Sequence, residues 1–211
     1  MTRAVIFDCD GVLVDSELIS NRVLADLLTE AGLPTTFEDC MRDFRGRSMA
    51  SVLAIAGERH ADAWSFDVAA RYYAEVQSVF ARELEPVPGV IDALDRIALP
   101  SCVASSGPHH KMAVTLRRTG LWERFEGRIF SAGEVTAGKP APDLFLHAAA
   151  RMGFDPASTA VVEDSLPGVE AAVAAGMRAL AFARHGDACE LAAAGGEPFH
   201  EMAELPALLQ A

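Results

Sequence analysis

Cysteine supplies neither a disulfide framework nor a recognisable metal site in this sequence. The four cysteines, Cys9, Cys40, Cys102 and Cys189, form no CxxC pair and no cluster with histidine. Cys9 and Cys102 lie in apolar runs, where a thiol usually packs as a small buried hydrophobe. We therefore predict a reduced chain located in the cytoplasm.

Long apolar segments are also absent. No run of 18 apolar residues occurs, and the first apolar run, residues 3–7, stops at Asp8. A membrane-spanning helix needs about 20 apolar residues, and a signal peptide needs a longer apolar region than this one. We therefore expect no membrane partner and no secretion signal.

Basic residues are scarce relative to acidic ones. The sequence has 18 Lys and Arg against 30 Asp and Glu, which gives a formal net charge of -12. A surface of this sign repels nucleic acid backbones, so we expect no nucleic acid partner. A small phosphorylated metabolite is still compatible, because a cleft can carry a local charge of its own. Hydrophobic residues make up 51% of the 211, which is enough for a buried core, and a monomer is the default expectation.

Five short apolar runs predict the strands of a parallel sheet. They lack the alternation of a half-exposed strand, which is typical of strands covered by helices on both faces. Helical patterns alternate with the later runs, and several of them close at a glycine. The expected strands are residues 3–7, 101–105, 128–131, 159–163 and 179–182, and the expected helices are 88–97, 108–119, 143–152 and 167–175. This order predicts an α/β fold with a doubly wound parallel sheet, followed after Gly186 by one or two terminal helices.

Residues 15–86 interrupt this alternation directly after the first strand. Apolar residues recur there at helical spacing, segments 37–44, 49–56 and 66–84 also have helical patterns, and no strand is expected. We therefore predict two domains, an α/β core made of residues 1–14 and 87–211 and an all-helical insert of residues 15–86.

The strongest functional signal is the segment Asp8-Cys9-Asp10-Gly11 at the end of the first expected strand. Two carboxylates this close repel each other and favour protonation of one of them. Polar loops after strands are common, so this segment alone does not establish a site.

Three further polar segments occur at or near strand ends. Ser105-Ser106-Gly107 ends the second expected strand and precedes a helix, whose free backbone amides can bind an anion. Lys139 stands just before another helix, and Glu163-Asp164 ends the fourth strand. Ligands of open α/β sheets bind at the carboxyl ends of the strands, so we expect these side chains to meet there.

These motifs together resemble the haloacid dehalogenase superfamily of phosphotransferases, over essentially the whole chain. The four motifs are DxDGVLVDSE from Asp8, the serine of VASSG at 105, the lysine of GKP at 139 and EDS from Glu163. Within the superfamily the sequence is most similar to the β-phosphoglucomutase-like phosphatases. The resemblance implies that the insert is a small α-helical cap.

The resemblance also implies Mg²⁺ as the cofactor. Its ligands would be the Asp8 carboxylate, the Asp10 backbone carbonyl and Asp164, with Glu163 close by or acting through water. Asp8 would attack phosphorus and form an aspartyl-phosphate. Asp10 would protonate the leaving alcohol and then deprotonate the attacking water.

The remaining implied roles concern the phosphoryl group and the substrate. Ser105 and the backbone amides of Ser106 and Gly107 would hold phosphoryl oxygens, and Lys139 would offset the repulsion between Asp8 and phosphate. A basic residue of the cap loop, Arg45 or Arg47, would reach the distal group of the substrate, although a solvated basic loop explains the pair equally well. His109 and His110 could touch substrate, but an exposed helix start explains them more simply.

The expected function is Mg²⁺-dependent hydrolysis of a small sugar phosphate or phosphorylated sugar acid, such as 6-phosphogluconate. A sugar phosphomutase is the first alternative, and the histidine that such relatives carry early in the cap is absent from residues 18–21. A dehalogenase would lack Asp10, and a phosphonate hydrolase would need a cap lysine, which residues 15–86 do not contain. A non-catalytic phosphate-binding protein on the same fold is the alternative from another class.

Overall fold

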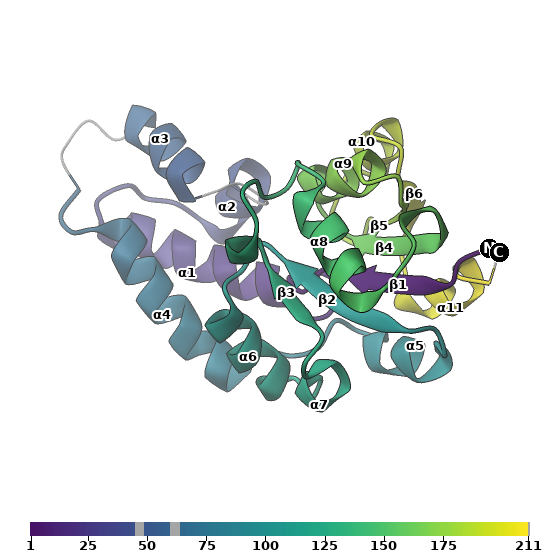
Figure 1. Ribbon diagram of the computed structural model, residues 1–211. Helices are drawn as coiled ribbons and strands as arrows, with labels where there is room; N and C mark the ends of the chain where they lie inside the picture. The colour runs from purple at the N-terminus through teal and green to yellow at the C-terminus, as the bar shows by residue number, and fades with distance from the viewer. Residues whose placement is uncertain (45–48, 60–63, 211) are drawn as a thin grey trace. The chain divides into compact units, whose positions relative to one another are not determined.

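The computed structural model describes residues 1–44, 49–59 and 64–210, and the chain is made of two compact units (Figure 1). One unit contains Met1–Asp15 and Glu85–Ala211, and the other contains Ser16–Leu84. The assignment of the second unit as a cap over a catalytic site is still a prediction. Among the described residues, no helix is long and apolar enough to cross a membrane.

A six-stranded sheet forms the centre of the first unit, with the strand order β3-β2-β1-β4-β5-β6. All of its neighbouring strands pair in parallel. The strands are β1 (Ala4–Phe7), β2 (Ser101–Ser105), β3 (Ile129–Ser131), β4 (Thr159–Glu163), β5 (Arg178–Phe182) and β6 (Glu197–Phe199). The predicted fold class is therefore confirmed, and β1 lies between β2 and β4 at the middle of the sheet.

Helices cover both faces of this sheet, which explains why its strands are continuously apolar. Figure 1 shows α8, α9 and α10 on one face and α5, α6, α7 and α11 on the other. Their bounds are α5 (Val90–Arg96), α6 (His109–Arg118), α7 (Trp122–Phe125), α8 (Asp143–Met152), α9 (Leu166–Ala174), α10 (Ala188–Ala193) and α11 (Leu205–Leu208). Successive residues of β1 serve opposite faces, because Ile6 joins the core cluster that includes Phe145 of α8, whereas the Phe7 ring packs 6.0 Å from that of Phe125 in α7.

The second unit is helical throughout residues 16–44, 49–59 and 64–84, apart from its connecting turns. Its helices are α1 (Ser16–Glu30), α2 (Phe37–Asp43), α3 (Met49–Arg59) and α4 (Val68–Glu83). Leu24 and Leu28 of α1 join Cys40, Val52 and other apolar residues in a buried core of its own. A capping box at Thr36 and Asp39 fixes the start of α2.

The two points where the chain leaves and re-enters the first unit lie side by side. Val14 forms an antiparallel bridge with Pro86, and the amide of Asp15 donates to the carbonyl of Glu85 over 3.0 Å. The Asp15 carboxylate also accepts a 2.9 Å hydrogen bond from Arg184, which follows β5. The two crossing segments are therefore paired with each other, and Asp15 is also tied to the segment after β5.

The C-terminal segment differs from the prediction of helices alone. Between α10 and α11 the chain forms β6, which pairs with β5 at the edge of the sheet. This strand has only three residues and contains Pro198, which cannot donate to a ladder and is tolerated at a sheet edge. A three-residue strand with a proline carries almost no periodic signal, which is why the sequence did not predict it.

Candidate active site

The predicted acidic residues gather at the carboxyl edge of the sheet, because the strands that carry them are parallel neighbours. Asp8 directly follows β1, Glu163 is the last residue of β4, and the two strands pair in register from Ala4 with Thr159 to Phe7 with Val162. The Asp8 amide donates to the carbonyl of Val162 over 3.0 Å, which continues the ladder to the start of the site.

Lys139 joins these two carboxylates. Its Nζ lies 2.5 Å from Oδ1 of Asp8 and 2.5 Å from Oε1 of Glu163, and it also donates to the carbonyl of Ala104 over 3.4 Å. The side chains of Lys139, Asp8 and Glu163 are 5%, 8% and 1% exposed. Burial at this level makes isolated charges costly, so the shared cation is what allows two carboxylates to stand together.

The protonation of this cluster reflects burial and mutual charge. The pKa of Asp8 is raised from its usual value of 3.8 to about 7, and burial is the largest cause; Lys139 acts in the opposite direction, and the neighbouring carboxylates of Glu163 and Asp10 add to the rise. Burial alone would lower the pKa of Lys139, but the carboxylates of Asp8 and Glu163 raise it above its usual value. Lys139 is therefore a fixed cation, and Asp8 is the group whose charge depends on its surroundings.

Asp10 is held by a residue that the sequence analysis did not assign to the site. Nζ of Lys111, on the first turn of α6, lies 2.7 Å from Oδ2 of Asp10. The side chains of Lys111 and Asp10 are 26% and 29% exposed, so this pair is more open than the one around Lys139. Composition is the one feature of the sequence that could have drawn attention to Lys111, because Lys111 and Lys139 are its only two lysines.

Two glycines make room for the acidic residues after β4. A Cβ on Gly11, which has a φ of +77°, would lie 2.1 Å from Oδ2 of Asp164. A Cβ on Gly168 would lie 1.9 Å from the Glu163 carboxylate. The Asp164 carboxylate therefore sits directly against the loop that carries Asp8 and Asp10, as the sequence predicts for the fourth motif.

Ser105 ends β2 beside this cluster and is 1% exposed. Its Oγ accepts a 3.2 Å hydrogen bond from the amide of Gly107, and the exposed Ser106 lies between them. The carbonyl of Gly107 accepts a 2.8 Å hydrogen bond from Oγ of Ser131 at the end of β3. The predicted phosphate loop is thus tied to two neighbouring strands.

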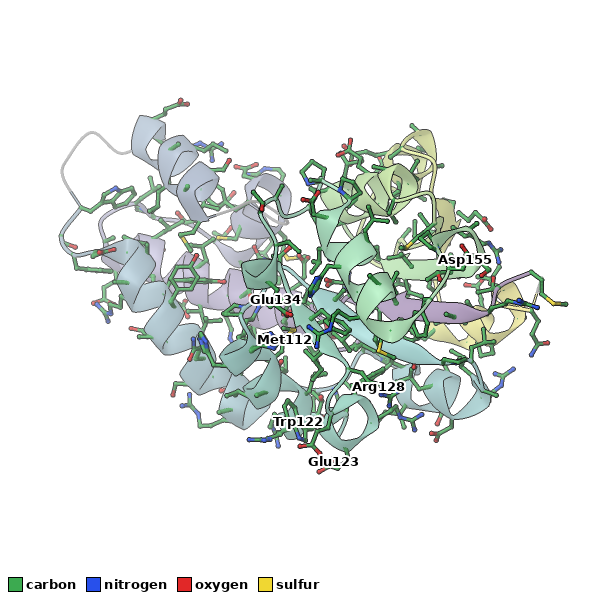
Figure 2. The ribbon with its side chains drawn as sticks, in the orientation of Figure 1. Met112, Trp122, Glu123, Arg128, Glu134 and Asp155 are labelled. Atoms are coloured by element: carbon green, nitrogen blue, oxygen red, sulfur yellow. The ribbon has the colours of Figure 1, made fainter. Side chains whose placement is uncertain are left out.

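Glu134, labelled in Figure 2, contacts three residues near this loop. Its carboxylate accepts hydrogen bonds from the amide of Ser131 over 2.7 Å, and it lies 2.8 Å from Nε2 of His109 and 3.1 Å from Nε2 of His147. Burial favours protonation of Glu134, but these hydrogen bonds outweigh it and lower the pKa of Glu134 below its usual value. Glu134, Ser131 and His147 were not predicted, and Glu134 gives His109 a structural partner.

Cys9 is buried between the two acidic residues, with its Sγ 4.0 Å from Oγ1 of Thr115 in α6. Burial raises the pKa of the Cys9 thiol well above its usual value. A protonated thiol packed against α6 fits the interpretation of Cys9 as a core residue, not a nucleophile. The two cap arginines of the prediction, Arg45 and Arg47, lie outside the described residues.

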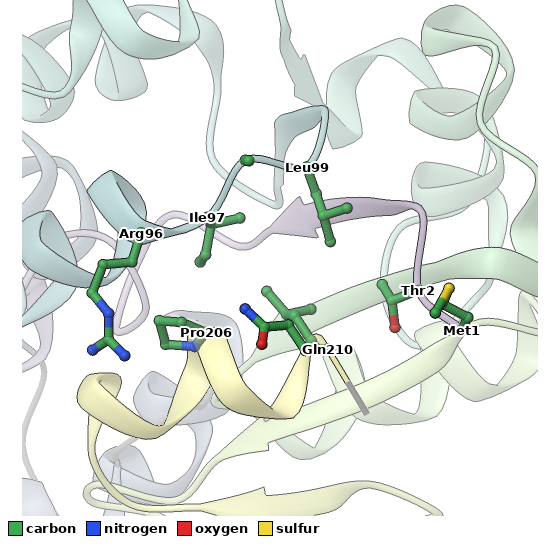
Figure 3. Close-up of a pocket in the computed structure, with 9 residues that line it drawn as sticks. Met1, Thr2, Arg96, Ile97, Leu99, Pro206 and Gln210 are labelled. Atoms are coloured by element: carbon green, nitrogen blue, oxygen red, sulfur yellow. The ribbon is translucent and has the colours of Figure 1, made fainter.

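No three His, Cys, Asp or Glu side chains within residues 1–44, 49–59 and 64–210 are arranged to hold a metal ion together. A cavity of about 350 Å³ lies at the opposite edge of the sheet, before β1 and β2 (Figure 3). Thr2, Ile97, Leu99 and Pro206 are among its lining residues, and none of the predicted site residues lines it. The chemistry is therefore expected at the carboxyl edge and not in this apolar hollow.

A parallel α/β sheet with acidic side chains and a buried lysine at its carboxyl edge has the architecture expected of an aspartate-based phosphotransferase. The sequence model of the haloacid dehalogenase-like hydrolases matches residues 2–176, and the chain belongs to this family. Two curated relatives are phosphatases. The chain is 33% identical to 6-phosphogluconate phosphatase of Escherichia coli strain K12, over 85% of this chain and 82% of that protein. It is 34% identical to a phosphorylated carbohydrates phosphatase of Thermotoga maritima, over 83% of this chain and 82% of that protein.

Solved structures agree with this placement. A haloacid dehalogenase-like protein of unknown function from Agrobacterium tumefaciens matches with a TM-score of 0.92 and 36% identity, covering 100% of this chain and 98% of that one. A proposed β-phosphoglucomutase from Thermotoga maritima matches with a TM-score of 0.81 and 30% identity, covering 100% and 99%. The predicted superfamily, subgroup and enzyme class, a phosphatase, are thereby confirmed. Segments such as KPAPDLFLHAA also resemble 6-phosphogluconate phosphatase, and the 33% identity to that enzyme agrees with this likeness.

Proposed function

We propose that this enzyme hydrolyses the phosphomonoester of a small sugar phosphate or phosphorylated sugar acid through a phosphorylated Asp8. The observation that carries the proposal is the 2.5 Å contact between Lys139 and Asp8, within a cluster that also holds Glu163. The named sugar phosphatases among its relatives support the substrate class.

Asp8 acts as the nucleophile in this proposal. One of its carboxylate oxygens bonds to phosphorus while the bond to the leaving alcohol oxygen breaks, which gives an aspartyl-phosphate. Asp10 gives its proton to that alcohol oxygen and is left as a carboxylate. It next takes a proton from a water molecule that attacks phosphorus, so that phosphate leaves and Asp8 is regenerated.

Positioning and charge supply most of the remaining catalysis. Lys139 reduces the repulsion between Asp8 and the incoming phosphate. Ser105 and the amides of Ser106 and Gly107 hold the equatorial phosphoryl oxygens at the start of α6. The Gly107 amide, which donates to Oγ of Ser105, would exchange that bond for one to the phosphoryl group.

Mg²⁺ fits the donors at this site. Asp8, Asp164 and the backbone carbonyl of Asp10 are hard oxygen donors, and the space that Gly11 leaves brings the Asp164 carboxylate against the Asp8–Asp10 loop. This set uses two side chains and one carbonyl, so it does not require three metal-binding side chains. When bound, the ion would neutralise charge that otherwise repels a phosphate dianion.

Glu163 is better assigned to Lys139 than to the metal ion. One of its oxygens contacts Lys139, and the other accepts 2.8 Å hydrogen bonds from the amide and the hydroxyl of Ser165. With both oxygens engaged, Glu163 would act by holding Lys139 in place and would reach the ion only through water.

Phosphate release from 6-phosphogluconate with Mg²⁺, using Asp8→Asn as the blank, tests the proposal. Turnover that is absent from Asp8→Asn and abolished by EDTA supports the nucleophile and the metal ion. If 6-phosphogluconate is not hydrolysed, a panel of neutral sugar and polyol phosphates tests whether the enzyme hydrolyses another phosphomonoester. Failure on the whole panel overturns the hydrolase proposal and favours a mutase or a phosphate-binding protein, which a mutase assay and phosphate titration separate.

The proposal also assigns a role to the two predicted cap arginines, Arg45 and Arg47, which would bind the distal group of the substrate. Substitution of Arg45 or Arg47 by Met should raise KM for an acidic sugar phosphate more than KM for a neutral aryl phosphate. An equal rise for both substrates removes the proposed role.

A further inference from the structure

The side chain of Lys111 packs against Gly107 of the predicted phosphate loop. A Cβ built on Gly107 would lie 3.4 Å from Cδ of Lys111, 3.6 Å from Oγ of Ser105 and 3.8 Å from Oδ2 of Asp10. The aliphatic part of Lys111 therefore runs over Gly107, and its ammonium ends at Asp10. Lysine, the phosphate-loop serine and the second aspartate converge within one small space.

The helix that carries Lys111 is fixed against the same loop. The amide of Lys111 donates to the carbonyl of Pro108 over 3.0 Å, which closes the first turn of α6. One turn later, Thr115 contacts the buried thiol of Cys9, which lies between Asp8 and Asp10 in the sequence. The backbone of Lys111 is therefore held by contacts that do not depend on its own side chain.

The use of lysine at this position stands out against the rest of the chain. Only two of the 18 basic residues are lysines, and each one binds an aspartate of the first motif, Lys139 to Asp8 and Lys111 to Asp10. An ammonium is a compact charge that donates to one oxygen without the planar fork of arginine. The contact in this structure is of this kind, because the ammonium of Lys111 lies 2.7 Å from Oδ2 of Asp10.

We propose that Lys111 is a positioning residue that orients Asp10 for proton transfer to the leaving group. It acts by binding Oδ2, which fixes the rotation of the carboxylate about its Cβ–Cγ bond and directs the other oxygen to the reacting atoms. The proposal rests on the proposed function, in which Asp10 is the acid and base. Lys111 itself transfers no proton and forms no bond to the substrate.

The need for Asp10 depends on the leaving group, and this provides the test. A sugar alkoxide is a poor leaving group and requires protonation, whereas p-nitrophenolate leaves without a proton. The ratio kcat/KM reports only the steps up to the release of the first product, so it isolates the step in which Asp10 acts as an acid. We expect Lys111→Met to lower kcat/KM by about 10- to 100-fold on a sugar phosphate, a part of the usual contribution of a general acid.

On p-nitrophenyl phosphate the same variant should lose less than about threefold, because proton donation contributes little there. Lys111→Arg should restore part of the lost activity on the sugar phosphate. Arg117→Met is the matched control, since it removes a cation from an exposed position of the same helix and should behave as the wild type. A fall that is equal on both substrates overturns the proposal and assigns Lys111 to direct phosphate binding.

A double-mutant cycle identifies the residue through which Lys111 acts. In the Asp10→Asn background, Lys111→Met should cause no further loss of kcat/KM on the sugar phosphate. A full additional loss in that background contradicts action through Asp10. Thermal unfolding of each variant shows whether a loss arises from unfolding of α6, which would lower activity on both substrates alike.

Crystal structures separate this proposal from the proposed function. In the wild type the Lys111–Asp10 contact should be present, and in Lys111→Met the Asp10 carboxylate should rotate or occupy more than one conformation. If the wild type hydrolyses no phosphomonoester, the proposed function fails, and an unchanged Asp10 in Lys111→Met then refutes the orienting role independently.

Discussion

Lys139 Nζ lies 2.5 Å from Oδ1 of Asp8, and both side chains are almost completely buried. Burial raises the pKa of Asp8 to about 7, and the charge of Lys139 is the strongest influence that opposes this rise. Because a nucleophile must be ionised, the Lys139 contact favours the form of Asp8 that can attack phosphorus.

Lys139→Met should therefore shift the pH dependence of the enzyme. Loss of the cation raises the pKa of Asp8 further, so the acidic limb of kcat/KM should move to higher pH and activity at pH 7 should fall strongly. A pH profile with p-nitrophenyl phosphate measures this, because that substrate depends least on Asp10. Arg117→Met, which removes a distant cation, should leave the limb in place. A uniform loss of activity with an unmoved limb contradicts the argument.

Asp8→Asn should change how stability depends on pH in metal-free buffer. The folded protein keeps a proton on Asp8 up to about pH 7, whereas an unfolded chain releases it near the usual value of 3.8. The stability of the wild type is therefore lost progressively as pH rises through this window. Asn does not titrate, so the melting temperature of Asp8→Asn relative to the wild type should increase from pH 4 to pH 7. A constant difference across this range would argue against a raised pKa.

Gly168→Ala should disturb the site by displacing the Glu163 side chain. The added Cβ would lie 1.9 Å from the Glu163 carboxylate, so this side chain must move away from Lys139 and Ser165. We expect a loss of about 1–3 kcal/mol in the free energy of unfolding, typical of overpacking, together with reduced kcat. Urea unfolding and steady-state kinetics measure the two effects.

The matched control for that substitution is Gly57→Ala in α3. Gly57 is also helical and is exposed, and an added Cβ there would meet nothing within 4 Å. The same change should stabilise the protein by about 0.5–1 kcal/mol through helix propensity. Stabilisation by both substitutions would show that Glu163 relaxes without cost.

The parts of this site that the sequence predicted are those fixed by strand ends. Asp8, Ser105 and Glu163 stand at the ends of apolar runs, and parallel neighbours bring those ends together whatever the details of packing. Lys111 was missed because its contact with Asp10 depends on how α6 packs beside Gly107. This packing is a tertiary contact that no local sequence pattern predicts. Glu134 was missed for a similar reason, since its partners His109 and His147 come from two different helices.

Glu134→Ala should loosen the phosphate loop without touching the reacting groups. The carboxylate of Glu134 holds the amide of Ser131, whose hydroxyl donates to Gly107, so its loss removes support from the loop one residue away from Ser106. Hydrogen bonds of this kind contribute about 0.5–1.5 kcal/mol each, so inorganic phosphate should inhibit about 2- to 10-fold more weakly, with a smaller change in kcat. Glu123→Ala, an exposed acid on α7 (Figure 2), removes the same charge away from the loop and should leave phosphate inhibition unchanged. Equal weakening in both variants would indicate a general charge effect, whereas a change confined to Glu134→Ala supports a loop that is positioned through Ser131.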